Sequence, residues 1–184
     1  MKKLFLILIS LIIFPIFALE LKTNMERASY VLGVSEGKIM KENFSDIENP
    51  RKLKIFDLEA YLAGISDSYY SKNFSYKSKE LLEAKLKFFK ALGAENFEDM
   101  AEQNPRASYS MGIEKGSELK EMFGIFVEEQ ISLNLEIFKL GLKDAFLGRK
   151  LSVKEEEIPQ IIKNFLSAFQ KATSKLIKQQ LSKN

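Results

Sequence analysis

The sequence of 184 residues contains no cysteine, no histidine and no tryptophan. Without cysteine and histidine, the chain can form neither a disulfide nor a thiolate or imidazole metal site. A serine–histidine–aspartate triad and a cysteine nucleophile are excluded for the same reason. Any catalysis would have to use carboxylates, lysine, tyrosine, serine or backbone groups, and we expect no catalytic residue, no metal and no cofactor.

The N-terminus has the features of a secretory signal peptide. The basic pair Lys2–Lys3 precedes an almost unbroken apolar run over residues 4–14, and Ala18 offers a small residue for cleavage. The apolar stretch covers about 16 residues, fewer than the roughly 20 of a membrane-spanning helix. We predict a signal peptide over residues 1–18 and a periplasmic or secreted location, with an uncleaved inner-membrane tether as the alternative. Removing the two lysines lowers the net charge from +3 to +1, which gives no reason to expect nucleic-acid binding.

The remaining chain contains an internal repeat. Residues 27–44 (RASYVLGVSEGKIMKENF) and 106–123 (RASYSMGIEKGSELKEMF) are identical at nine of eighteen positions, at an offset of 79. The similarity continues between residues 56–69 and 133–146 at an offset of 77, so the second copy lacks two residues of the intervening loop. Since repeats at a fixed offset indicate repeated structural units, we predict a tandem duplication.

Each copy has the apolar spacing and the capping residues typical of three helices. Thr23 and Ser152 begin predicted capping boxes, and Asn104 precedes a proline at a first helical position. Gly148 is a predicted C-terminal cap, and Pro159 should kink the last helix near its start. The predicted helix starts are Thr23, Asp57 and Ser78 in the first copy and Asn104, Asn134 and Ser152 in the second.

No segment alternates apolar and polar residues over the length of a strand, so we predict an all-α fold. Its two tandem three-helix modules would cover residues 19–103 and 104–184, with intertwined first helices and long third helices.

Two glycines four residues apart occur in each predicted first helix, Gly33 with Gly37 and Gly112 with Gly116. A glycine inside a helix costs about 1 kcal/mol relative to alanine, so a compensating interaction is expected. Glycines at this spacing share one helix face, where a second backbone can approach closely. The alternative is that they break the helix into loops. We predict that the two first helices cross, and the predicted crossing or dimerisation residues are Tyr30, Gly33, Gly37, Met40, Tyr109, Gly112, Gly116 and Met122.

The repeated pattern Arg-Ala-Ser-Tyr-x-x-Gly-x-x-x-Gly, followed by a helix with x-Leu-Glu-x-x-x-x-Gly-x-x-Asp, resembles the N-terminal dimerisation domain of FKBP-type prolyl isomerases of the macrophage-infectivity-potentiator class. The second copy matches better, through Gly141, Asp144, Ala145 and Gly148. In the first copy Ser68 replaces that alanine, and no glycine follows Tyr70.

The resemblance implies an intertwined homodimer that acts as a clamp or chaperone for unfolded chains. Only three residues follow Leu181, so we expect the β-rich isomerase domain of that family to be missing. We therefore expect a non-catalytic folding accessory that binds unfolded proteins or an envelope partner. It would self-associate as a homodimer or through its two modules within one chain. The alternatives are a prolyl isomerase with an unrecognised site and a structural adaptor for a full-length isomerase or another envelope enzyme.

Three further features are ascribed to ordinary structure. We expect the lysines of the basic segment over residues 158–184 to complement the negative end of a helix dipole. The alternative is that they bind acidic partners or a membrane surface. The aromatic pairs Tyr69–Tyr70 and Phe88–Phe89 are expected in the core rather than along a groove. The carboxylates repeated eight residues apart, Glu59 with Asp67 and Glu136 with Asp144, are expected as caps or surface charges.

Overall fold

The computed structural model describes residues 21–45, 47–49, 53–126 and 131–182. Within these ranges the chain forms six α-helices and no strand, which confirms the all-α class. The predicted signal peptide, residues 1–18, lies outside the described residues. The helices are α1 (Asn24–Met40), α2 (Leu58–Tyr69), α3 (Ser78–Gly93), α4 (Phe97–Gly124), α5 (Leu135–Phe146) and α6 (Ile158–Leu181).

Three helix starts confirm the caps predicted from the sequence. At α1, the Thr23 hydroxyl accepts from the Glu26 amide at 3.0 Å, and the Glu26 carboxylate accepts from the Thr23 amide at 2.9 Å. The side chains of Asp57 and Asn134 cap α2 and α5 in the same way. These caps satisfy amides that have no partner inside the helix. At its other end α1 continues into a π-helical turn, Lys41–Ser45.

The predicted start at Asn104 is wrong, because α4 begins at Phe97 with Asn96 as its cap. The helix runs through Pro105, although proline lacks the amide that an interior position needs. Packing of the added turns outweighs this loss, since Met100 is fully buried where α4 contacts α3. The Asn104 side chain donates instead to the carbonyl of Lys54. The predicted module boundary after residue 103 therefore falls inside a helix.

The predicted capping box from Ser152 to Glu155 is also wrong. A short 3₁₀ turn, Glu155–Glu157, precedes α6, and the Ser152 amide donates to the hydroxyl of Tyr30. Because α6 begins at Ile158, Pro159 lies in its first turn. The backbone amides of a first turn have no hydrogen-bond partner inside the helix, so the amide that proline lacks is not needed there. The predicted kink is therefore not required.

The second helix of each half ends in the same turn. Gly148 follows α5 with a φ of +64°, as predicted for a C-terminal cap. Ser71 follows α2 with a φ of +54°, although a left-handed conformation is unfavourable for serine. In both turns an amide bonds a carbonyl five residues earlier at 2.8 Å, from Arg149 to Asp144 and from Lys72 to Asp67. The first half thus forms this turn without the glycine.

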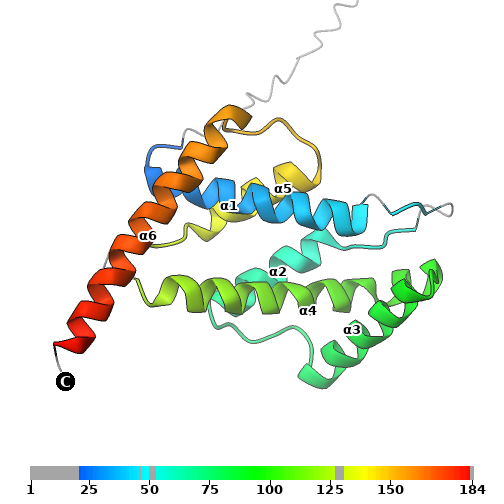
Figure 1. The fold of residues 1–184 in the computed structure, drawn as a ribbon. Helices are drawn as coiled ribbons and strands as arrows, with labels where there is room; N and C mark the ends of the chain where they lie inside the picture. The colour runs from blue at the N-terminus through cyan, green and yellow to red at the C-terminus, as the bar shows by residue number, and fades with distance from the viewer. Residues whose placement is uncertain (1–20, 46, 50–52, 127–130, 183–184) are drawn as a thin grey trace, which may run out of the picture.

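The helices pack across the two halves of the sequence. The two largest helix contacts join α2 with α4 and α1 with α5, and further contacts join α3 with α4 and α6 with α1. Figure 1 shows α1 lying along α5, with α2 beside α4 and with α3 and α6 at opposite ends of the molecule. One continuous core runs between these layers and includes Tyr30, Tyr61, Phe88, Phe123 and Phe138.

Among the described residues, no helix has both the length and the apolar character needed to cross a membrane.

Candidate functional site: the paired helix crossings

The glycines of α1 lie against the backbone of α5. A Cβ atom added to Gly33 would lie 1.9 Å from the carbonyl oxygen of Phe138, and one added to Gly37 would lie 2.3 Å from that of Leu142. From the opposite side, a Cβ on Gly141 would lie 2.1 Å from the carbonyl oxygen of Tyr30. Both helices therefore need glycine for this close approach.

The glycines of α4 lie against α2 in the same manner. A Cβ atom added to Gly112 would lie 2.1 Å from the carbonyl oxygen of Tyr61, and one added to Gly116 would lie 2.4 Å from that of Ile65. The facing glycine is Gly64, whose added Cβ would lie 2.2 Å from the carbonyl oxygen of Tyr109. The two crossings thus use the same positions of the sequence repeat.

The predicted crossing of the Gly33–Gly37 helix with the Gly112–Gly116 helix is wrong. Each first helix crosses the second helix of the other half, and both helices of each crossing have a glycine at the contact. On the second helices these glycines are Gly64, which lies against α4, and Gly141, which lies against α1. The repeat aligned these two residues, and this was the sequence signal for the correct pairing.

A buried tyrosine ties the first crossing together. The Tyr30 hydroxyl donates to the Asp144 carboxylate at 2.9 Å and accepts from the Ser152 amide at 2.9 Å. The Tyr30 and Asp144 side chains are buried, and Arg149 lies 3.9 Å from the carboxylate. Tyr30 therefore joins α1 to the end of α5 and to the segment that leads into α6.

A second tyrosine repeats this arrangement at the other crossing. The Tyr109 hydroxyl donates to the Asp67 carboxylate at 2.7 Å and accepts from the Ser75 amide at 3.0 Å. The ring of Tyr76 packs edge-on against it, with centroids 5.4 Å apart. Tyr109 therefore joins α4 to the end of α2 and to the segment that leads into α3.

The serine before each tyrosine also bridges the halves. The Ser29 hydroxyl accepts from the Asn134 amide at 3.0 Å, and the Ser108 hydroxyl accepts from the Asp57 amide at 3.0 Å. Each bond satisfies the free amide of a helix-capping residue. The Ser-Tyr part of the repeated motif thus fixes the start and the end of the partner helix.

The hydrogen bonds between the tyrosines and the aspartates were not predicted. Asp67 and Asp144 were expected as caps or surface charges, although both tyrosines and both aspartates recur in the repeat. The two predicted methionines differ: Met40 is buried beside the first crossing, whereas Met122 is exposed. Met122 therefore does not fill a buried seam as predicted.

An ion pair lies between the two first helices. The Lys115 ammonium is 3.1 Å from the Glu36 carboxylate and 2.8 Å from that of Glu118. The Tyr61 hydroxyl donates to Glu36 at 2.7 Å. Burial lowers the pKa of Lys115, but the Glu118 hydrogen bond and the charge of Glu36 outweigh it, so the pKa is raised.

We expect the protein to lose stability above about pH 10. Burial raises the pKa of Tyr30, Tyr61 and Tyr109 above the ordinary tyrosine value of 10.0. In that range the folded state holds protons that the unfolded state has released, so the free energy of unfolding falls as pH rises. Urea unfolding at about pH 8 and pH 11 would measure the difference. An equal midpoint at both values would contradict it.

The tyrosine hydroxyls of both crossings are bonded within the folded chain. Each donates to a carboxylate and accepts from a backbone amide. Among the described residues, no group of three or more acidic side chains could hold a metal ion. The hydrogen bonds of the two tyrosines join helices of the two halves.

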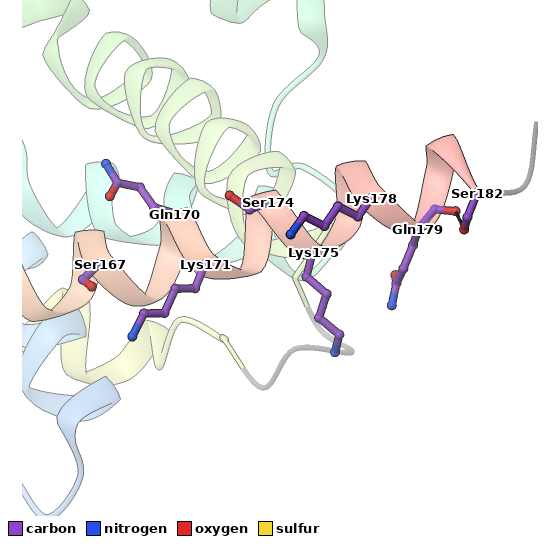
Figure 2. Close-up of a pocket in the computed structure, with 8 residues that line it drawn as sticks. All are labelled: Ser167, Gln170, Lys171, Ser174, Lys175, Lys178, Gln179 and Ser182. Carbon is purple, nitrogen blue, oxygen red and sulfur yellow. Dashed lines mark hydrogen bonds between the residues drawn. The ribbon is translucent and has the colours of Figure 1, made fainter.

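A shallow depression on α6 gathers polar side chains, but a single helix forms it. Figure 2 shows the eight labelled lining side chains spread along α6, and all of them belong to this helix except Ser182, which directly follows it. Because cations near a helix C-terminus complement its dipole, the lysines have a structural explanation. Its lining residues are Ser167, Gln170, Lys171, Ser174, Lys175, Lys178, Gln179 and Ser182.

One comparison with known proteins bears on this geometry. Residues 104–184 match the family model described as the domain amino-terminal to FKBP-type peptidyl-prolyl isomerase, so this part of the chain is similar to that domain. The resemblance stated for the second copy is confirmed, while for residues 19–103 it stays a prediction. No curated protein and no solved structure matches the chain significantly.

Proposed function

We propose, from the amino-terminal FKBP-type domain at residues 104–184, that the chain is a non-catalytic protein-folding accessory of the periplasm. It would be exported by residues 1–18 and would hold apolar segments of unfolded proteins. The observation that supports client binding most directly is an exposed apolar stripe on α3.

The α3 stripe consists of Leu82, Leu86 and Phe89, which are 57%, 62% and 43% exposed. Their spacing of four and three residues places them on one helix face. The opposite face of α3 packs against α4 through buried residues such as Ala84 and Phe88. The stripe is therefore not needed for the core, and contiguous exposed apolar side chains are typical of interaction surfaces.

The third helix of the other half also exposes large apolar side chains. Since α3 and α6 lie at opposite ends of the molecule (Figure 1), one extended client could contact both. Two weak apolar sites on one rigid body bind such a client better than either site alone. The exposed apolar residues of α6 are Leu166, Ile177 and Leu181.

We expect wild-type protein to suppress aggregation of a denatured model enzyme, and the double variant Leu82→Ser/Leu86→Ser to lose most of this activity. The substitutions remove apolar contact area from an exposed face, so melting temperature should change by under about 2 °C. Light scattering of the diluted client and thermal unfolding of the variant measure the two effects.

Ile39→Ser is the matched control, because Ile39 is similarly exposed but lies on α1. It should suppress aggregation like the wild type. Equal activity of the α3 double variant would contradict client binding at the stripe, and no suppression by the wild type would contradict the proposed function itself. A proline-peptide exchange assay should give only the uncatalysed rate; acceleration would favour the isomerase alternative.

A further inference from the structure

Glu36 and Lys115 occupy equivalent positions of the sequence repeat, 79 residues apart, yet carry opposite charges. The structure brings them together at 3.1 Å, with side chains only 14% and 23% exposed. They come from α1 and α4, whose contact is otherwise small beside those of α1 with α5 and α2 with α4. The ion pair therefore lies where the corresponding helices of the two halves meet each other.

The surroundings of the two charges also differ between the halves. Tyr61 donates its hydroxyl to Glu36 at 2.7 Å. The repeat-equivalent residue in the second half is Phe138, which has no hydroxyl to donate. Glu36 therefore has a hydrogen-bond donor beside it, and the repeat does not conserve that donor in the second half.

We propose that Glu36 and Lys115 determine the pairing of the two halves. A first half pairs with a second half, and two identical halves do not pair. Two first halves in this geometry would place Glu36 against another Glu36. Two second halves would place Lys115 against another Lys115. Like charges with little exposure to water repel strongly, because solvent screens them poorly.

The same charge pattern explains why the two halves of one chain can pair without a second chain. The second half is tethered to the first, so its local concentration exceeds that of any half from another molecule. Charge excludes the pairing of identical halves, and the tether favours the partner within the chain. The outcome is a closed monomer at micromolar concentrations. This inference is independent of client binding.

Charge reversal in the full chain tests the proposal. Glu36→Lys places two lysines at the contact, and Lys115→Glu places two glutamates there. Each single variant should lose about 5–10 °C in melting temperature, because two like charges with little exposure to water then face each other. The reversed pair Glu36→Lys/Lys115→Glu should recover at least half of the larger loss. The control Glu83→Lys, in the exposed Lys79–Glu83 pair, should change it by under about 2 °C.

Mixing the two single variants separates pairing specificity from general stabilisation. In a refolded equimolar mixture, the first half of the Glu36→Lys chain can pair with the second half of the Lys115→Glu chain. The two unaltered halves, which keep Lys115 and Glu36, can pair with each other. We expect a 1:1 heterodimer of twice the monomer mass, formed by exchange of halves. Neither variant alone should form it, and wild type should stay monomeric.

Sedimentation velocity and native mass spectrometry with one isotope-labelled variant measure these species. A mixture that holds only the two separate chains would overturn the proposal. Single variants as stable as the wild type would overturn it as well, and a wild-type homodimer would overturn the closed monomer.

Discussion

Gly33→Ala is expected to lower the melting temperature by about 10–20 °C, corresponding to about 3–5 kcal/mol of unfolding free energy. The added Cβ would lie 1.9 Å from the carbonyl oxygen of Phe138, a backbone atom that cannot rotate away. Helices α1 and α5 would have to separate, and their buried contacts would loosen together. Thermal unfolding followed by circular dichroism measures the loss.

Two further variants make this result specific. Gly112→Ala should cost about as much, since its Cβ would lie 2.1 Å from the carbonyl oxygen of Tyr61. Gly93→Ala is the control, because a Cβ there meets nothing within 4 Å, and it should be neutral or stabilise by up to about 1 kcal/mol. Equal melting temperatures for Gly33→Ala and Gly93→Ala would refute the close crossing.

Tyr30→Phe should cost about 2–4 kcal/mol while leaving the ring in place. It removes the hydroxyl that donates to Asp144 and accepts from the Ser152 amide, both at 2.9 Å. The buried carboxylate then lacks its hydrogen-bond donor, and α6 loses a connection to α1. Urea unfolding measures the cost, and hydrogen exchange at Ser152 reports the freed amide.

Tyr109→Phe should show a similar loss, with exchange increased at Ser75 instead. Tyr70→Phe is the matched control, since Tyr70 is exposed and its hydroxyl is not part of either crossing, and its effect should stay within about 0.5 kcal/mol. If Tyr30→Phe were as mild as Tyr70→Phe, the buried bond would not stabilise the crossing.

Helix content could be predicted well, whereas several helix starts could not. Thr23, Asp57 and Asn134 cap helices as expected, because an N-terminal cap is a local hydrogen bond. Asn104 has the same local signal but lies inside α4. Met100 lies in the added turns of α4 and is fully buried, and this burial depends on tertiary packing that no local sequence pattern contains.

Several residues of the helix crossings could be predicted from the sequence, but the helix that each of them contacts could not. The repeat singled out Tyr30, Gly33, Tyr109 and Gly112, and all four lie at the two crossings. Which helix each of them faces depends on atoms far away along the chain, so spacing alone gave the wrong pair of helices. The repeat also contained Asp67 and Asp144, but their bonds to tyrosine are a property of the packed molecule.

The all-helical class, the repeated glycines and the lack of histidine or cysteine chemistry follow from the amino-acid sequence, because periodicity, capping and composition are local properties. The crossing of each first helix with the second helix of the other half follows from the packed structure, and so does the contact between Glu36 and Lys115. Both depend on complementary surfaces and charges distant along the chain, which become neighbours only when the core is closed.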